Sequence, residues 1–143
     1  MSIHQEAKFP VSPQIIYDLL TDESKFTTVT GKAAKIGVSE GKEFTLFGGL
    51  IHGRQIELIS GKRIVQAWRM ADWAAGVYSI VRFTFSPEGT ETKLTIDQEA
   101  YPDGKSPMFA SWHEHLSAGW KMFYLQPFAK HLAVEMEPVV SAR

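Results

Sequence analysis

The sequence contains no cysteine and no asparagine. Without cysteine, the chain has no disulfide, no thiolate nucleophile and no cysteine-based zinc site, and this fits a reducing compartment. Without asparagine, it has no acceptor for N-linked glycosylation. We therefore expect a cytoplasmic protein.

Long apolar runs and an excess of one charge are also missing. No run approaches the ~18 apolar residues that a membrane span needs, and residues 1–6 lack the basic start and apolar stretch of a signal peptide. Fifteen basic and sixteen acidic side chains leave a net charge of −1. We therefore expect neither nucleic acid nor a membrane as a partner.

The composition that remains is an ordinary globular one, with 143 residues of which 44% are apolar and 22% are charged. This length supports one domain with a substantial core. We predict a single domain over residues 1–143, with a core at about 3–133 and a C-terminal tail at 134–143.

The N-terminal part predicts one strand and two short helices. Apolar and polar side chains alternate over residues 3–9, a pattern typical of a half-buried strand. Ser12 and Pro13 then supply an N-cap and a favourable first helical residue. Thr21–Asp22 begins a second helix, which Gly31 ends.

From residue 34 onward the hydrophobic period changes to two. Six strands are expected at about 34–38, 43–47, 51–59, 63–69, 78–86 and 91–98. Most of the connections are as short as Ser60–Gly61, so neighbouring strands should pair antiparallel in a meander. One face of this sheet should be wet and the other covered.

A last long helix is expected at about 107–133. Its apolar stripe would contain Phe109, Trp112, Leu116, Trp120, Phe123 and Pro127. Because so much aromatic surface needs a broad sheet to cover it, we predict an α+β helix-grip fold. In this fold a curved antiparallel sheet, in the order β-α-α-β6-α, wraps around the C-terminal helix and leaves a pocket between sheet and helix.

Strand alternation places polar side chains on the covered face. Counting back by two from Ile56 gives Arg54 and His52. Since a buried guanidinium needs an anionic partner, these two residues could hold an anionic or polar head group. A β-bulge near Gly48–Gly49 or Gly53 would reverse the alternation and leave both side chains in solvent.

The same counting places Gln66, Ser79 and Gln98 on the covered face. An unpaired buried polar group costs about 1–3 kcal/mol. These groups should therefore pair with one another, reach water at the rim or face a cavity. The candidate ligand-binding residues are Phe44, His52, Arg54, Gln66, Trp68, Ser79, Phe83, Trp112, Leu116, Trp120 and Phe123.

Motifs for metal binding or catalysis are not recognisable. His113 and His115 stand two residues apart on the predicted helix and point about 200° apart. The helical zinc motif needs a second histidine at i+4, where this chain has Ser117. There is no Gly-x-Ser-x-Gly elbow and no evident acid/base pair of carboxylates. We expect no metal, no cofactor and no catalytic residue.

Residues 44–54, FTLFGGLIHGR, and residues 61–69, GKRIVQAWR, resemble the family of activator of heat-shock-protein-90 ATPase homologue-like proteins. Further matching pieces are Leu20–Asp22, Asp72–Trp73, Gly76–Ser79, and Gly119–Trp120 followed by Tyr124 and Pro127. They cover about residues 8–132 in the expected order. Val29–Gly31 and Leu125 depart from the pattern, because the family often has tryptophan near both places.

The resemblance implies the same helix-grip fold within the START-like superfamily, which binds apolar or amphipathic molecules between sheet and helix. It implies no catalytic set. Our first hypothesis is therefore binding of a small hydrophobic or amphipathic molecule in that space. A second is a co-chaperone-like module that acts on a chaperone ATPase through its outer surface, and a third is a START-like enzyme of small metabolites. A homodimer is a further possible assembly.

Overall fold

The computed structural model describes residues 2–141, and it describes side chains over residues 2–133. The strands are β1 (Ser2–Phe9), β2 (Lys35–Ile36), β3 (Glu43–Leu46), β4 (Ile51–Ile59), β5 (Arg63–Met70), β6 (Ser79–Glu88) and β7 (Glu91–Glu99). The helical elements are α1 (Pro13–Thr21), α2 (Glu23–Thr30), the 3₁₀ turn η1 (Phe47–Gly49), α3 (Trp112–Gly119), the π turn η2 (Trp120–Leu125) and α4 (Gln126–Ser141). No helix among the described residues is both long enough and apolar enough to cross a membrane.

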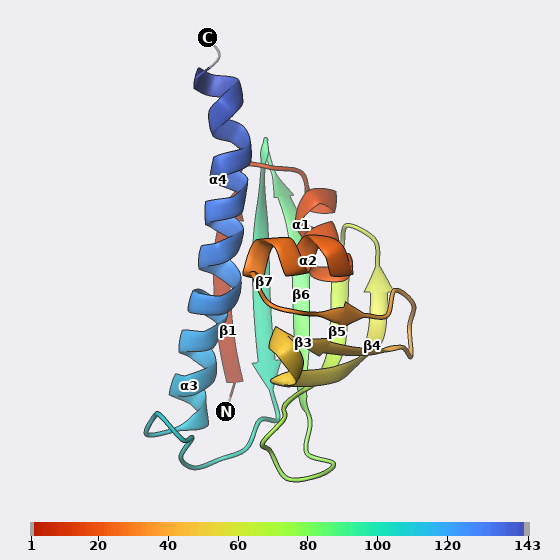
Figure 1. The fold of residues 1–143 in the computed structure, drawn as a ribbon, viewed down its shortest axis with the longest axis vertical. Coiled ribbons are helices and arrows are strands. Elements are labelled where there is room, and N and C mark those ends of the chain that lie inside the picture. Colours follow the sequence, from red (N-terminus) through yellow and green to blue (C-terminus); the bar gives the residue numbers. More distant parts are fainter. Residues whose placement is uncertain (1, 142–143) are drawn as a thin grey trace.

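The strands form one antiparallel sheet in the order β1-β7-β6-β5-β4-β3-β2. Strands β2 to β7 follow the chain as a meander, and β1 returns to pair with β7 from Ser2 opposite Glu99 to Phe9 opposite Thr92. The C-terminal helix runs along one face of the sheet, and α1 and α2 lie on that same face (Figure 1). The predicted α+β helix-grip fold is confirmed, with one face covered and one face in solvent.

Alternation along the central strands supplies the core. The inward-facing members of β5, β6 and β7 are all buried: Ile64, Gln66, Trp68, Met70, Val81, Phe83, Phe85, Leu94, Ile96 and Gln98. Ile3 and Phe9 of β1 are buried as expected, and α1 adds Ile16, Leu19 and Leu20 from its apolar side. The second helix begins where the sequence predicted, since the carboxylate of Asp22 accepts a hydrogen bond from the Lys25 amide at 3.0 Å.

Strand β4 departs from simple alternation. Its register against β5 shifts between Gln55 and Glu57, which is a β-bulge at Ile56. For the residues that precede the bulge, the extra residue exchanges the side chains that face the core with those that face solvent. Gln55 is therefore buried while Arg54 is exposed. The expectation that Arg54 and His52 lie on the covered face was wrong for this reason. The bulge lies two to three residues beyond Gly53, one of the places where the sequence allowed for it.

The C-terminal helix begins at Trp112, so the expected start at residue 107 was wrong and Phe109 lies in the preceding loop. Within the helix, the π turn η2 contains one more residue per turn than an α-helix, which rotates all later side chains by about 100°. The buried stripe is consequently Trp112, Leu116, Trp120, Tyr124, Phe128 and Leu132. Phe123, expected in the stripe, is 51% exposed.

The helix also extends further than expected. Element α4 continues to Ser141, so most of the segment predicted as a tail at 134–143 has a helical backbone.

Candidate functional site

The space between sheet and helix is filled by aromatic side chains. Trp120 lies at its centre, with ring centroids 5.4 Å from Trp68, 5.7 Å from Phe83 and 4.6 Å from Tyr124. A void beside them, lined by Phe44, Gln66, Phe83 and Tyr124 among others, leaves no room for a water molecule. Around Trp120 the structure therefore shows packed side chains where the sequence led us to expect a pocket.

Most of the predicted ligand-binding residues are part of this core. Phe44, Gln66, Trp68, Ser79, Phe83, Trp112, Leu116 and Trp120 are all buried. His52, Arg54 and Phe123 are not. The structure thus brings eight of the eleven predicted residues together, as packing partners of the sheet and helix.

Three buried polar side chains, those of Trp120, Gln98 and Ser79, form a chain of hydrogen bonds, whereas Gln66 Oε1, Trp68 Nε1 and the Tyr124 hydroxyl have no hydrogen-bond partner among the described residues. The Trp120 indole donates a hydrogen bond to Gln98 Oε1 at 2.7 Å, and Gln98 Nε2 donates to Ser79 Oγ at 3.0 Å. Ser79 in turn donates to the Trp68 carbonyl at 2.8 Å. For Gln98 and Ser79, the first of the three predicted alternatives, pairing with other buried groups, is confirmed. These hydrogen bonds tie the helix to β7, β6 and β5 in turn.

A second pair lies nearby, where Gln66 Nε2 donates to Gln55 Oε1 at 3.1 Å. Tyr124 faces the same small void as Gln66. Burial raises the pKa of Tyr124 well above its ordinary value, so its hydroxyl stays protonated. None of these side chains carries a charge at neutral pH.

Arg54 is engaged on the outer surface. Its guanidinium donates to the Gly41 carbonyl at 2.7 Å and to Glu43 Oε1 at 3.0 Å. Both Arg54 and Glu43 are largely exposed, so this ion pair is a solvent-screened contact. The proposal that Arg54 and His52 read a head group inside the fold was wrong, because the bulge in β4 points both side chains outward.

The two histidines of α3 have separate environments. The His113 ring lies 6.2 Å from the Tyr101 ring, while the His115 ring lies 4.7 Å from the Trp112 ring and 5.4 Å from Phe109. Burial lowers the pKa of His115, which favours its neutral form. Among the described residues, no group of three or more potential ligands could hold a metal ion.

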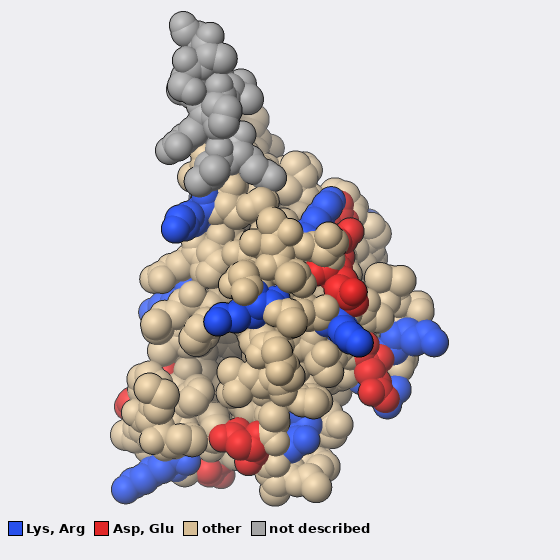
Figure 2. Space-filling view, viewed as in Figure 1, with Lys and Arg blue, Asp and Glu red and all other residues tan. Residues whose placement is uncertain are grey.

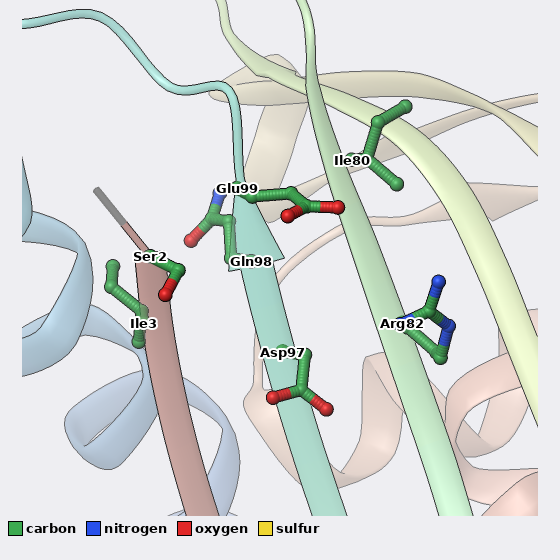
Figure 3. A pocket seen from close by; sticks show the side chains of 7 residues that line it. All are labelled: Ser2, Ile3, Ile80, Arg82, Asp97, Gln98 and Glu99. Atoms are coloured by element: carbon green, nitrogen blue, oxygen red, sulfur yellow. The ribbon is translucent and has the colours of Figure 1, made fainter.

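A charged hollow of about 260 Å³ lies on the outer face of the sheet. Arg82 of β6 and Asp97 and Glu99 of β7 line it from adjacent strands (Figure 3). Asp97 is engaged by His4 on β1, whose Nδ1 lies 2.6 Å from Asp97 Oδ1 and whose Nε2 lies 2.9 Å from Glu6 Oε2. Asp97 and Glu6 therefore form an exposed network with His4 and not an isolated acid/base pair.

This network predicts a pH dependence of stability. Hydrogen bonds to Asp97 and Glu6 raise the pKa of His4 above its ordinary value. Because the folded-state pKa is the higher one, the stabilisation is complete below the unfolded-state pKa and is lost as the pH rises through the folded-state pKa. We expect His4→Gln to lower the free energy of unfolding at about pH 5.5 and to have little effect at about pH 8.5.

Urea denaturation of both proteins at the two pH values measures this difference. His52→Gln is the control, because His52 also lies on the outer face but pairs with no carboxylate among the described residues. A loss of stability in His4→Gln that is the same at both pH values would contradict the prediction.

An open cleft lies at the start of α3. It has a volume of about 520 Å³ and is bounded by Trp73 and Val77 on one side and by Pro102, Pro107 and Trp112 on the other. Both of its walls are held in place by hydrogen bonds. Arg69 donates to the Val77 carbonyl at 3.2 Å and to the Trp73 carbonyl, and the Trp112 amide donates to the Gly104 carbonyl at 3.0 Å.

Sequence reasoning missed this cleft as a site, although Trp112 was among the predicted residues. The cleft joins two loops, at 71–78 and 100–111, that are distant in the sequence. Trp73 and Trp112 both line it and pack edge to face, with ring centroids 5.5 Å apart. No local pattern signals that contact, because it depends on where the sheet places the two loops.

The architecture places the chain in the helix-grip class, with a seven-stranded sheet, two short helices and a long C-terminal helix on one face. A family model described as Activator of Hsp90 ATPase homolog 1-like protein matches residues 10–133. The chain belongs to this family, as the sequence resemblance indicated.

Curated relatives carry the same description. The chain is 34% identical over 115 residues to an activator of 90 kDa heat shock protein ATPase homolog from Dictyostelium discoideum, covering 80% of this chain and 28% of the relative. It is 25% identical over 118 residues to activator of 90 kDa heat shock protein ATPase homolog 1 from Homo sapiens, covering 82% and 33%. The chain thus spans about a third of the length of these relatives.

Solved structures agree with the fold. The structure of an HSP90 activator from Plasmodium falciparum superposes with a TM-score of 0.85 at 27% identity, covering 93% of this chain and 96% of that one. The Aha1 dimer from Colwellia psychrerythraea superposes with a TM-score of 0.76 at 16% identity, covering 92% and 96%. At that identity the second likeness concerns the fold alone.

Proposed function

We propose that this chain is a co-chaperone-like interaction module that stimulates the ATPase of an Hsp90-class chaperone through its outer surface. Family membership and the names of the relatives support the proposal. The observation that carries it is the filled interior. Trp120 is only 2% exposed and occupies the space between sheet and helix where a START-like ligand would lie, so recognition falls to the surface.

The test is the steady-state ATPase rate of the purified Hsp90-class chaperone from the same organism, with and without this chain. We expect the rate to rise with the concentration of the chain and to saturate. Heat-denatured chain serves as the control, because it has the same composition without the surface. A rate that stays flat at saturating chain, together with no binding by isothermal titration calorimetry, would exclude this function.

A second candidate function is binding of a small amphipathic molecule, and the cleft lined by Trp73 and Trp112 is the observation that favours it. Its volume of about 520 Å³ lies within the range of about 300–1,000 Å³ that is usual for ligand pockets. Its walls are mainly apolar, and Asp72 and Lys105 at its border could orient a polar end.

Native mass spectrometry of the never-denatured protein, compared with its denatured mass, tests this second function. A reproducible additional mass that Trp112→Ala abolishes would support it. A bare mass, with no change in tryptophan fluorescence on addition of palmitate or anilinonaphthalene sulfonate, would exclude it. Dimerisation also stays a prediction, and light scattering on the same sample measures it directly.

A further inference from the structure

Two local distortions occur side by side at the surface, where η1 meets the π turn. Phe47, the first residue of η1, has a φ of 54°, in the left-handed region that bulky residues rarely adopt. Gly48 and Gly49 follow with φ values of 70° and 96°, which glycine adopts without strain. The Gly48 amide donates to the Ala33 carbonyl at 2.9 Å, which fixes this turn against the segment after α2.

The π turn lies directly against this loop. The Phe47 and Phe123 rings meet edge to face with centroids 5.8 Å apart, and Phe47 also lies 5.6 Å from Tyr124. Tyr124 is buried, whereas Phe123 is 51% exposed and Met122 is 57% exposed. We call Phe47, Met122 and Phe123 the aromatic patch.

Both distortions place side chains in the core, since Phe47 packs against Phe26 and Tyr124 and the π turn buries Tyr124. A left-handed phenylalanine and a π turn both cost conformational free energy, and such features occur often at functional sites. An uninterrupted α-helix would turn Phe123 toward the sheet, as its spacing from Trp120 predicts. The π turn instead presents Phe123 and Met122 to solvent, so about half of each side chain gains nothing from burial.

Two lysines border the patch. Lys32 precedes Ala33, whose carbonyl accepts the hydrogen bond from Gly48, and Lys35 lies opposite Thr45, two residues before Phe47. One carboxylate, that of Glu23, is also close, and its Oε1 accepts a hydrogen bond from the Ile36 amide at 2.9 Å. Both lysines are exposed, and neither takes part in any ion pair among the described residues. Figure 2 shows basic side chains at several places on this face, with acidic side chains to the right, at the bottom and at the lower left.

We propose that the aromatic patch is the surface with which this chain docks on the chaperone, and that its partner is an apolar groove bordered by carboxylates. The inference rests on the proposed function and names the surface through which the chain would act. Aromatic and methionine side chains are enriched in the core of protein interfaces, with charged groups at the rim. Phe123 and Met122 would enter the groove, and Lys32 and Lys35 would face its acidic border, where they mainly steer association.

The experiment measures the affinity of the full chain for the same Hsp90-class chaperone, together with the ATPase rate. One variant, Phe123→Ala, removes the central ring, and a second, Lys32→Glu with Lys35→Glu, reverses the rim charge. Matched controls are Ile56→Ala, an apolar residue 47% exposed on β4, and Lys42→Glu with Lys62→Glu, two exposed lysines outside the patch. Thermal unfolding by circular dichroism confirms that each variant is folded.

We expect both patch variants to bind at least about tenfold more weakly than the wild-type chain, and both controls to stay within about twofold. Added salt should weaken wild-type binding and should have less effect on the lysine variant. If wild type binds and both folded patch variants bind equally well, the patch assignment is wrong while the proposed function stands. If wild type itself neither binds nor stimulates, the function fails and the docking surface with it.

Discussion

Replacing Trp120 by alanine is expected to lower the free energy of unfolding by about 3–5 kcal/mol, as measured by urea denaturation. The indole is buried among Trp68, Phe83 and Tyr124, so its removal leaves a cavity that the surrounding rings cannot fill. The substitution also leaves the Gln98 amide oxygen without its 2.7 Å hydrogen bond, an additional penalty in a dry interior.

Phe123→Ala is the control in the same helix. Phe123 lies three residues further on and is 51% exposed, so we expect a loss below about 1 kcal/mol. If Trp120→Ala prevents folding, Trp120→Phe takes its place, because it keeps most of the volume and removes the donor. Equal losses at positions 120 and 123 would show that the helix has no π turn and that both side chains share one buried face.

Replacing Gly53 by alanine is expected to destabilise the protein by about 3 kcal/mol, near the upper end for overpacking. A Cβ atom at position 53 would lie 2.2 Å from the Ala67 carbonyl oxygen and 2.3 Å from Cζ of Phe44. The carbonyl belongs to β5, which pairs with β4, so the contact can be relieved only by separating the two strands. Thermal and urea denaturation both measure the loss.

Gly119→Ala provides the matched control. Its added Cβ would meet only Phe123 Cδ2, at 3.9 Å, and position 119 has helical dihedral angles. Because alanine restricts the unfolded chain and favours helix, we expect a gain of about 0.5–1 kcal/mol. A Gly53→Ala protein as stable as the wild type would contradict the close packing of Phe44 between β4 and the core.

These predictions bear on function because they concern the space between the sheet and the C-terminal helix. The sequence resemblance led us to expect a ligand in the space between sheet and helix, whereas Trp120, Trp68 and Phe83 occupy it. The polar residues that the sequence placed there, Gln98 and Ser79, bond to each other and to the helix. A packed core of this kind provides a rigid support for an outer docking surface.

The sequence alone determined the fold class, the order of the elements and most of the core. Period-two alternation over residues 63–69 and 91–98 predicted strands that the structure confirms, because side chains on a strand point alternately to its two faces. Short connections predicted the antiparallel meander, since they cannot join parallel neighbours. The family resemblance was confirmed over residues 10–133.

The tertiary structure alone decided which side chains face inward near two irregularities. The bulge at Ile56 moved Arg54 and His52 to the outer face, and the π turn exchanged Phe123 for Tyr124 in the core. Each inserts one residue into a regular repeat, so the local pattern on either side looks normal and only the facing element reveals the shift in register. The tertiary structure also decided the cleft and the aromatic patch, because both join segments that come together only when the helix lies against the sheet.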